Sequence, residues 1–466
     1  MLRRFLSSSV IKTDLKDIVI IGGGPAGLSL ASALKNSPIL KDYSCTLVEG
    51  FNLVEPLQNF HDNPPENFMN RVVSITPTSV DFLKKIGAWD FIHHERIQSY
   101  DYIHTYDGVS GAQLELDTPD LATMIENFNI QSGLLKRIEE LNLQQLDNQL
   151  EIKDNTKVIN IEKDPVDQWP ILELENGDKI KTRLLIGCDG NNSPARKFAQ
   201  IESRGWAYNR WGIVGTAKYN DDAFFRNPKG WQRFLPTGTF ALLPLPDNWC
   251  SFVWAVPPEL SNVLMNLPED KFLPLLNAAA KLSPDELNCL YQLASKNDDA
   301  LVDEIKWRLD LFNSKLNTQE DFDQFPSELE YLVPKSRGKF PLKLTHADSY
   351  ISERVALVGD AAHTTNPLAG QGLNMGQGDV KSLIETLEKS AERGLDIGNK
   401  IALEPYFSER YLANHILLGI VDKIHKIHST DFAPVVWARS TGIKILNNLP
   451  FVKDFMTEGV SRNRIF

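Results

Sequence analysis

The chain opens with an apolar run, a glycine-rich turn and a helical pattern. Asp17-Ile18-Val19-Ile20-Ile21 leads directly into Gly22-Gly23-Gly24-Pro25-Ala26-Gly27, and an Ala- and Leu-rich stretch then continues to about Asn36. A short apolar run bounded by glycines predicts a buried strand, and Pro25 suits the first turn of a helix. Because a second apolar run ends at Glu49, this part of the sequence predicts a βαβ unit.

The hydrophobic pattern changes several times further along the chain. Leu and Ile recur at helical spacing over residues 127–146, and three strand-like pieces follow before residue 188. Residues 212–256 are rich in aromatic side chains and punctuated by turns, which predicts an antiparallel sheet in a second domain. Residues 259–325 return to a polar, helical pattern, and residues 354–360 again have the pattern of a strand that leads into glycines.

These patterns predict an α/β fold with a discontinuous Rossmann-like domain, an antiparallel-sheet domain and a C-terminal helical region. The predicted boundaries are 17–95, 120–205 and 346–400 for the first domain, 96–119 and 206–345 for the second with a helical insertion at about 259–325, and 401–466 for the C-terminal helices.

Composition narrows the class of protein. The chain has 466 residues, of which 42% are hydrophobic and 24% charged, and these values are typical of a globular chain with two or more domains. A formal net charge of −12 disfavours bulk binding of nucleic acid. The four cysteines are widely separated and form no C-x-x-C pair, which favours a reducing compartment over a disulfide framework and predicts no metal site. No stretch reaches the roughly 18 to 20 uninterrupted apolar residues of a membrane-spanning helix.

Residues 1–16 have the composition of a targeting segment. Arg3, Arg4 and Lys12 stand among apolar residues, Ser7 to Ser9 form a serine run, and no acidic residue precedes Asp14. This basic, serine-rich and acid-poor pattern is typical of a mitochondrial transit peptide. The alternative interpretation is an ordinary frayed terminus.

The C-terminal region carries a local positive charge. Between Tyr411 and Phe466, seven Lys or Arg residues stand against four Asp or Glu residues, with Trp437 and many aliphatic residues interleaved. This pattern is expected of helices that lie on an anionic membrane surface. An amphipathic helix packed on its own domain has the same pattern, so both interpretations stay open.

The glycine-rich turn has the spacing G-x-G-x-x-G at Gly22, Gly24 and Gly27. In this pattern the first glycine permits a tight turn, the second lets the backbone approach a pyrophosphate, and the third allows close packing of helix and strand. Glu49 lies 22 positions beyond Gly27, where a carboxylate suits the ribose hydroxyls of an adenosine. The turn therefore predicts a dinucleotide-binding site.

Two later segments resemble known flavoprotein motifs. Gly187-Cys188-Asp189-Gly190 follows one strand-like run. Gly359-Asp360 follows another, and Asn366-Pro367-Leu368-Ala369-Gly370-Gln371-Gly372-Leu373-Asn374 comes soon after it. Together with the glycine-rich turn, these segments resemble the three FAD motifs of the class A flavoprotein monooxygenases, whose familiar example is para-hydroxybenzoate hydroxylase. The motifs occur in the family's order over nearly the whole chain.

This resemblance implies FAD as the cofactor. Asp360 matches the aspartate that contacts the flavin ribose, and the run that begins at Pro367 matches the backbone N–H groups near the flavin ring. Asp189 and Gly190 match the pair that acts at the pyrophosphate. The implied cofactor residues are Gly22, Gly24, Gly27, Glu49, Arg71, Gln131, Asp189, Gly190, Asp360, Pro367, Gly370, Gly372 and Asn374.

Two members of this set have ordinary alternatives. Arg71 matches a family arginine that contacts the cofactor phosphates, but a surface ion pair would look the same in the sequence. Gln131 lies at the start of the helix that supplies an FAD contact in relatives, but a solvated helix position would look identical.

A closer resemblance concerns the residues around the last motif. The string Gly359-Asp360-Ala361-Ala362-His363 and the run to Gly376 are similar to the signature of the ubiquinone-biosynthesis hydroxylases. Residues 71–77, 230–238 and 340–348 resemble the fungal mitochondrial members of that family. The implied activity is FAD-dependent monooxygenation by O2 of a polyprenylated 4-hydroxybenzoate-type ring at position 5, ortho to the phenol. Asn366 departs from the family pattern, which usually has histidine there.

No catalytic side chain follows from the motifs, because the flavin carries the chemistry. His363 lies beside the last motif, but a histidine in such a place is more often a structural residue than a catalytic one. Trp231 and Arg233, in the β-rich region, are weak substrate-side candidates, with core packing and surface pairing as the alternatives.

The resemblance also implies a location and partners. The location is the matrix side of the mitochondrial inner membrane, as a peripheral protein. The partners are ferredoxin and ferredoxin reductase as electron donors, and other ubiquinone-synthesis proteins in a complex. The sequence contains no second G-x-G-x-x-G unit for a separate NADPH domain. Two other functions stay open, namely an FAD-dependent lipid dehydrogenase or reductase and a flavin-stabilised scaffold of the ubiquinone-synthesis complex.

Overall fold

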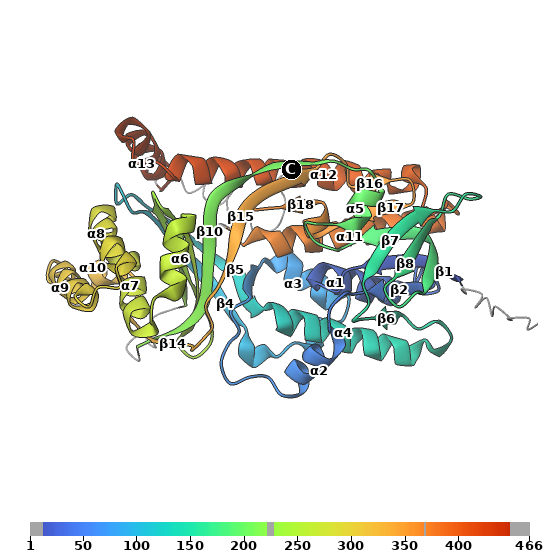
Figure 1. Cartoon of the computed structure of the whole chain (residues 1–466), viewed down its shortest axis with the longest axis horizontal. Helices are drawn as coiled ribbons and strands as arrows, with labels where there is room; N and C mark the ends of the chain where they lie inside the picture. The colour runs from blue at the N-terminus through green and yellow to red at the C-terminus, as the bar shows by residue number, and fades with distance from the viewer. Residues whose placement is uncertain (1–12, 221–227, 368–369, 448–466) are drawn as a thin grey trace, which may run out of the picture.

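Two β-sheets organise the computed structural model, which describes residues 13–220, 228–367 and 370–447 (Figure 1). Within these residues the first sheet has eight strands, in the path β16-β17-β9-β1-β2-β6 with β7 and β8 joined through β9. The strands are β1 (Thr13–Ile21), β2 (Cys45–Val48), β6 (Glu151–Lys153), β7 (Val158–Lys163), β8 (Pro170–Leu174), β9 (Lys179–Gly187), β16 (Ile351–Ser352) and β17 (Val355–Leu357). Because β17, β9, β1, β2 and β6 pair in parallel, this is the predicted Rossmann-like sheet.

The apolar run of β1 forms the centre of this domain. Ile18, Val19 and Ile20 are completely buried, as expected for a strand inside a parallel sheet. The helices of the domain are α1 (Pro25–Asn36), α2 (Val54–Asp62), α3 (Pro77–Lys85), α4 (Asn127–Gln144), α5 (Pro194–Phe198) and α11 (Gln371–Glu392). The first of them begins with Pro25 at the predicted place and packs against α4 and α11.

β1 begins earlier than its hydrophobic pattern indicates. Residues 13–16, which we assigned to the transit peptide, pair in parallel with residues 179–182 of β9. The predicted boundary at residue 17 is therefore wrong. Thr13, Asp14 and Leu15 are exposed, so this end of the strand has no apolar signature. Residues 1–12, which hold the rest of the predicted transit peptide, lie outside the described residues.

The second sheet is mostly antiparallel, and it has ten strands in the described part of the chain. Its path is β18-β15-β10-β13-β12-β11-β4-β5-β3, with β14 paired to β10. The strands are β3 (Val72–Ile75), β4 (Gln98–Asp107), β5 (Gln113–Glu126), β10 (Ser203–Tyr219), β11 (Lys229–Leu235), β12 (Gly238–Pro244), β13 (Trp249–Val256), β14 (Leu329–Leu332), β15 (Gly338–Ala347) and β18 (His363–Thr364). Only the pairing of β11 with β4 is parallel among these strands, so the predicted antiparallel sheet has one exception.

A group of helices covers one face of the second sheet, at the left of Figure 1. These are α6 (Pro258–Asn266), α7 (Glu269–Lys281), α8 (Pro284–Ser295), α9 (Leu301–Asn313) and α10 (Gln319–Asp323). Phe252 and Trp254 of β13 are fully buried and pack against Phe272 of α7. The predicted helical insertion at about 259–325 corresponds to these helices. The other face of the sheet is turned toward the first domain.

The two domains exchange more segments of chain than the predicted boundaries indicate. β3, the last part of β5, the first residues of β10 and the whole of β18 belong to the second sheet, although their residues fall in segments predicted for the first domain. The boundary between 119 and 120 lies inside β5. This strand adopts a left-handed conformation at Asp120 (φ 53°) and continues beyond it, so the polar sequence there marks an irregularity rather than an end.

Two further helices follow the first domain, α12 (Lys400–His428) and α13 (Ala433–Asn447). In Figure 1, α12 runs along the top edge, and α13 lies at the upper left. α13 is attached to the second domain by Arg439, whose Nε and Nη2 donate to the Asp107 carboxylate at 2.7 and 2.9 Å. In the part of the chain that the structure describes, no helix has the length and apolar character needed to cross a membrane. Residues 448–466 of the predicted C-terminal region lie outside the described residues.

Candidate active site

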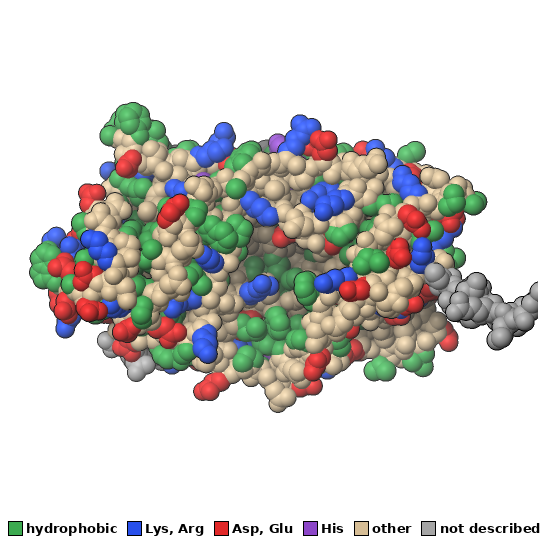
Figure 2. All heavy atoms as spheres, in the orientation of Figure 1, with side chains coloured by type: hydrophobic (Ala, Val, Ile, Leu, Met, Phe, Trp, Pro, Cys, Tyr) green, Lys and Arg blue, Asp and Glu red, His purple; other side chains and the backbone are tan. Residues whose placement is uncertain are grey.

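A cavity of about 580 Å³ lies between the two domains. Figure 2 shows a hollow at the centre of the visible face. The cavity is lined by the first turns of α1 and α11, by β3, by the loop after β9, by η5 (Gly359–Ala361) and by one face of the second sheet. A volume of several hundred Å³ between two domains is typical of a small-molecule or cofactor site.

The glycine-rich turn forms one side of the cavity. Gly22 has a φ of +106°, and a Cβ there would lie 2.3 Å from the carbonyl oxygen of Cys188. A Cβ at Gly27 would lie 1.9 Å from the carbonyl oxygen of Gly22, so only glycine fits at both positions. Gly24 lines the cavity, and a Cβ there would meet no atom within 4 Å. The turn and the helix–strand contact thus need the first and third glycines, and the second leaves room for a ligand.

Glu49 and Gln131 hold this turn from opposite sides. The Gly23 N–H donates to Glu49 Oε2 at 2.6 Å, and Gln131 Nε2 donates to the Gly23 carbonyl oxygen at 3.2 Å. Glu49 follows β2, and Gln131 lies in the second turn of α4. Neither side chain lines the cavity, but together they fix the backbone that does.

The loop after β9 reaches the cavity next to this turn. Gly190 lines the cavity, whereas the Asp189 carboxylate points toward α5 and its Oδ2 accepts the Ala195 N–H at 3.0 Å. Asp189 Oδ1 is buried and has no hydrogen-bond partner among the described residues. Burial raises the pKa of this carboxyl.

The third motif brings a carboxylate and a helix N-terminus to the cavity. Asp360 is exposed toward the cavity, and desolvation by the surrounding protein raises the pKa of its carboxyl. Pro367, Gly370 and Gly372 line the cavity at the start of α11. Neither α1 nor α11 has a side chain that caps its first turn. Because helix N-termini attract anions, this set of groups fits the phosphates and the ring of a flavin dinucleotide.

The thirteen predicted cofactor residues divide into two groups. Those that line the cavity are Gly24, Gly190, Asp360, Pro367, Gly370 and Gly372. Those that lie outside its lining are Gly22, Gly27, Glu49, Arg71, Gln131, Asp189 and Asn374. Arg71 is exposed and lies directly before β3, so its contact with a cofactor stays a prediction.

The Asn374 side chain joins three elements beside the cavity. Its Oδ1 accepts the Thr76 N–H at 2.9 Å and the Ser79 hydroxyl at 2.8 Å, and its Nδ2 donates to the carbonyl oxygens of Ser74 and Gly370 at 2.9 and 3.1 Å. These four bonds use the full hydrogen-bonding capacity of the amide. The side chain therefore ties α11 to β3 and α3, and the predicted contact of Asn374 with the cofactor, which concerns the backbone, stays a prediction.

The second sheet forms the opposite wall of the cavity. Gln232 lines it, whereas Trp231 and Arg233 point to the other face of β11. Trp231 stacks on His104 with 5.2 Å between ring centroids, and Arg233 donates to two backbone carbonyl oxygens at the end of α7. The substrate-side prediction for Trp231 and Arg233 is therefore wrong, because successive side chains of a strand point to opposite faces.

Several lining residues were missed from the sequence. The apolar ones are Ile103, Ala241, Leu243, Val253, Ala255, Phe340 and Leu342, and the polar ones include Tyr100, Thr239 and Lys343. The Tyr100 hydroxyl lies 2.9 Å from the Ser74 hydroxyl, and burial raises the pKa of Tyr100. The signal for this wall is the alternation along β12, in which Thr239, Ala241 and Leu243 occupy every second position.

His363 belongs to a buried network behind the cavity. Its Nε2 lies 2.6 Å from Asp379 Oδ2, while Arg410 Nε and Asn414 Nδ2 both donate to Oδ1 at 2.9 Å. The Gly359 N–H donates to the same carboxylate at 3.1 Å. Burial raises the pKa of Asp379, but the charges on His363 and Arg410 outweigh it and lower the value to about 2. His363 is 1% exposed and does not line the cavity, so it acts as a structural residue.

Asn366, at the position where the family usually has histidine, lines the cavity near α12. Its Nδ2 lies 3.4 Å from Nδ1 of His425. Burial lowers the pKa of His425 to about 4. It also lowers the pKa of His346 to about 4, and Nε2 of that ring lies 2.9 Å from the Tyr350 hydroxyl. Both imidazoles are therefore neutral near pH 7.

The chain matches one family model and a set of full-length relatives. The model is described as an FAD binding domain and covers residues 16–260 and 329–410. The mitochondrial ubiquinone biosynthesis monooxygenase COQ6 of Saccharomyces cerevisiae is 46% identical over 456 residues, which are 96% of this chain and 94% of the relative. The COQ6 protein of Schizosaccharomyces pombe is 36% identical over 98% of this chain and 94% of the relative. The human COQ6 protein is 32% identical over 94% of this chain and 91% of the relative.

Solved structures of other monooxygenases share the fold. The p-nitrophenol 4-monooxygenase PnpA of Pseudomonas putida superposes with a TM-score of 0.65 over 97% of this chain and 99% of that chain, at 17% identity. PqsL of Pseudomonas aeruginosa is described as a probable FAD-dependent monooxygenase. It superposes with a TM-score of 0.61 over 91% of this chain and 100% of that chain, also at 17% identity. These similarities concern the arrangement of the two sheets and the helices around them.

The two neutral histidines make folding sensitive to mild acid. The unfolded chain takes up protons at His346 and His425 near the ordinary pKa of 6.5, whereas the folded chain takes them up only near 4. We therefore expect full stability above pH 6.5 and a falling free energy of unfolding from 6.5 toward 4, at up to about 1.4 kcal/mol per pH unit for each histidine. Asp379 does not offset this loss, because its ordinary value is 3.8 and it titrates below the window.

Urea unfolding at roughly pH 7, 6 and 5 measures this slope. A His346→Gln/His425→Gln variant should have a flatter dependence over this window, while the exposed residue His94, changed to Gln, serves as the control and should keep the slope of the wild type. An equal slope in the wild type and the double variant would contradict the assignment.

Proposed function

The chain belongs to the family of ubiquinone biosynthesis monooxygenases, which are FAD-binding flavoproteins, and from this premise we propose the reaction that it carries out. The substrate is a polyprenylated 4-hydroxybenzoate-type compound, and the enzyme hydroxylates its ring at position 5, ortho to the phenolic oxygen. The observation that carries the proposal is the two-sided cavity. One wall offers backbone N–H groups and two helix N-termini, and the other is an apolar sheet face.

The proposed reaction replaces a ring C–H bond by a C–OH bond. One oxygen atom of O2 enters the ring and the other leaves as water, with two electrons from an external donor and two protons. Bound FAD supplies the activation of O2. Gly24, Gly190 and Asp360 would hold the cofactor on one side, together with the start of α11. The apolar residues of the sheet wall hold the ring of the substrate and exclude water.

Three polar side chains of the sheet wall suit a phenolic ring. Tyr100 is protonated near pH 7, as any tyrosine is, and burial raises its pKa further from the ordinary value of 10, so its Oη can donate a hydrogen bond toward a phenolic oxygen. Lys343 is the one cation among the described lining residues, and its positive charge favours the phenolate form. Gln232 presents an amide from the middle of the wall. In this arrangement the protein positions the ring and favours its electron-rich form.

We also propose a location and partners for this activity. The relatives are named as mitochondrial proteins, and a mitochondrial location suits the composition of residues 1–16. Ferredoxin with its reductase is the proposed electron source, and other ubiquinone-synthesis proteins are proposed to form a complex with the chain. A polyprenyl tail is strongly apolar, so delivery of the substrate calls for contact with a membrane on the matrix side of the inner membrane.

The outer face of α12 and α13 is the proposed membrane contact. Trp437 is 70% exposed and Leu412 is 61% exposed, and Lys423 lies on the same side of α12 as Leu412. In Figure 2 hydrophobic side chains gather at the upper left, where α13 lies. Exposed apolar and aromatic residues combined with lysine are the pattern of an interfacial helix.

The hydroxylation itself is tested with the purified holoenzyme. With isotopically labelled O2, a polyprenylated 4-hydroxybenzoate and the ferredoxin chain, we expect a product that has gained one labelled oxygen by mass spectrometry. Gly24→Asp should lose bound flavin and product, because it places a negative charge where the pyrophosphate is expected. Gly419→Asp is the matched control for flavin content, since a Cβ also meets nothing within 4 Å there. A reduced or dehydrogenated lipid in place of the hydroxylated product would replace the monooxygenase proposal.

The electron donor is tested by anaerobic reduction of the bound flavin. We expect the visible flavin bands to persist with NADPH alone and to bleach when ferredoxin and ferredoxin reductase are added, because the resemblance to the mitochondrial ubiquinone-biosynthesis hydroxylases implies reduction through a ferredoxin. Rapid bleaching by NADPH alone would overturn the proposed donor.

Membrane contact is tested with vesicles that contain cardiolipin. We expect Lys423→Glu with Lys426→Glu to reduce binding by roughly tenfold or more, because each lysine on an anionic surface contributes about 1 kcal/mol. Lys426 also pairs with Asp422 at 2.8 Å, so Lys423 alone should carry the larger share. Lys296→Glu with Lys306→Glu, at α8 and α9 of the helical insertion rather than on α12 or α13, makes the same change of charge and should leave binding unchanged. Equal binding by both double variants would contradict the assigned face.

A further inference from the structure

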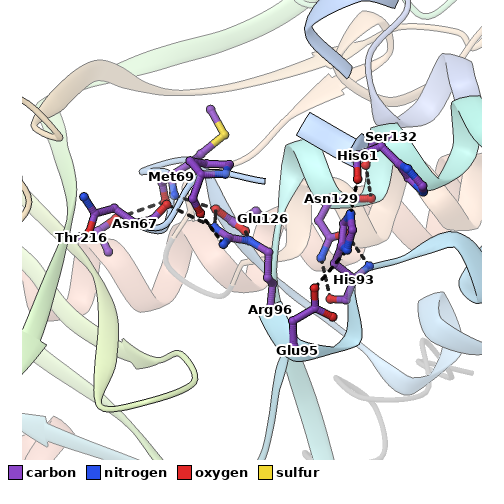
Figure 3. Close-up of polar contacts among 11 residues, drawn as sticks. His61, Asn67, Met69, His93, Glu95, Arg96, Glu126, Asn129, Ser132 and Thr216 are labelled. Atoms are coloured by element: carbon purple, nitrogen blue, oxygen red, sulfur yellow. Dashed lines mark hydrogen bonds and ion pairs between the residues drawn. The ribbon is translucent and has the colours of Figure 1, made fainter. Parts of the chain in front are cut away.

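The connection between α2 and β3, residues 63–71, has no regular secondary structure, yet it ends at the cavity. Arg71 is its last residue, and the next residues, Val72 to Ser74, line the cavity. An irregular segment of this length needs side-chain contacts to hold its backbone polar groups in place. Several of those contacts come from one short segment, His93–Arg96, of which Figure 3 labels His93, Glu95 and Arg96.

Arg96 and Glu126 form the first half of this contact. Arg96 Nε and Nη2 donate to the two carboxylate oxygens of Glu126 at 2.7 and 2.9 Å. Its guanidinium also donates to the carbonyl oxygens of Pro65 and Asn67, at 2.7 and 3.2 Å. The Met69 N–H donates to Glu126 at 2.6 Å, so the pair holds the middle of the connection at three backbone positions. Figure 3 shows this fork of bonds around Asn67, Met69 and Glu126.

His93 forms the second half. Its Nε2 lies 2.9 Å from the carbonyl oxygen of His61, in the last turn of α2. The backbone of His93 is fixed to α4, because its N–H donates to Asn129 Oδ1 at 2.9 Å and its carbonyl oxygen accepts from Asn129 Nδ2 at 3.0 Å. The segment His93–Arg96 therefore holds the connection at its start and in its middle.

The far end of the connection is tied to both domains. The Asn127 N–H, at the start of α4, donates to the Arg71 carbonyl oxygen at 2.9 Å. On the second sheet, the Thr216 hydroxyl donates to the Met69 carbonyl oxygen at 3.1 Å, and Asn70 Nδ2 donates to the Ser336 carbonyl oxygen. Arg71 is thus held on one side by the contacts of the connection and on the other by β3, whose first residue, Val72, pairs with Glu126.

The chemistry of the Arg96–Glu126 pair indicates positioning rather than bulk stability. Glu126 is completely buried, and burial of an ion pair costs desolvation energy that a packed apolar pair would avoid. The planar guanidinium gives directional bonds to a carboxylate and to two carbonyl groups at once, which a lysine cannot reproduce. The faces of Phe68 and Phe60, at 4.5 and 5.6 Å from the guanidinium carbon, restrict its orientation further.

We propose that His93–Arg96, with Glu126 and Asn129, is a positioning clamp that sets Arg71 at the phosphates of the bound FAD. This inference rests on the proposed function in that FAD is the cofactor, and on the prediction from the family resemblance that Arg71, which does not line the cavity itself, contacts the FAD phosphates. The clamp residues do not line the cavity, so they act through Arg71 and not on the ligand directly.

A double-mutant cycle on the dissociation constant for FAD tests the clamp. FAD is removed from the purified holoenzyme and titrated back, with flavin fluorescence as the signal. We expect Arg96→Lys to raise the dissociation constant about tenfold, because the charge remains but the fork to Pro65 and Asn67 is lost. We expect Arg71→Ala to raise it by at least as much, and the double variant to be no weaker than Arg71→Ala alone.

Two further single variants are added, Thr216→Val as a milder change to the connection and Ser132→Ala as a control. Thr216→Val removes only the bond to Met69 and leaves the ion pair intact, so it keeps the test available if Arg96→Lys does not fold; we expect about a threefold weaker affinity for FAD. Ser132 is buried in α4 and bonds only within that helix, at 3.1 Å to the Asn129 carbonyl oxygen, so Ser132→Ala should leave FAD affinity unchanged. Thermal unfolding of the apoproteins separates loss of affinity from loss of fold.

Two outcomes would overturn the clamp. One is an unchanged affinity for FAD in both Arg96→Lys and Thr216→Val, and the other is additive losses in the double variant. Because the cycle reads FAD affinity, it is independent of which product forms, and a holoenzyme that binds FAD without hydroxylating the ring would refute the proposed function alone.

Discussion

The Asp379 carboxylate is the buried charge on which the enclosure of the cavity depends. It receives bonds from the η5 backbone, from the ring of His363 and from two side chains of α12. These partners come from the strand–loop unit that carries Asp360, from the second sheet and from the C-terminal helices. A buried carboxylate that loses a charged partner typically costs about 3 to 5 kcal/mol. The third motif, both domains and α12 are therefore coupled through one side chain that never touches the cavity.

The two walls of the cavity solve different physical problems. The wall from the first domain is built of glycines and helix N-termini, because a charged dinucleotide needs many N–H donors and little steric obstruction. The wall from the second sheet is built of alternate apolar side chains, because an aromatic ring needs a flat, dry surface. Because each wall comes from a different domain, segments of the two domains meet and interleave at the cavity. β3 belongs to the second sheet but lies beside the start of α11, and Asn374 joins the two.

The sequence predicted the parts of the structure whose conformation is decided by residues close together in the chain. The Rossmann-like βαβ unit follows from an apolar run and a glycine turn, and the sterics of Gly22 and Gly27 agree with the spacing rule. Prediction failed where a tertiary contact decides the outcome. The first residues of β1 are polar and become a strand only because β9 lies beside them. Trp231 and Arg233 were chosen for their chemistry, but the register of β11 places Gln232 between them on the cavity side. The long-range contacts of His93 and Arg96 leave no local pattern at all.

The position of β1 at the centre of its sheet sets the order in which the chain can fold. β1 pairs with β2 on one side, and this neighbour follows within thirty residues. Its other neighbour, β9, begins at Lys179, and the strand beyond that, β17, begins only at Val355. During synthesis from the N-terminus, one edge of β1 therefore stays open until β9 has emerged. Such long-range pairing slows folding and exposes strand edges to aggregation, so the nascent first domain is a natural client for chaperones.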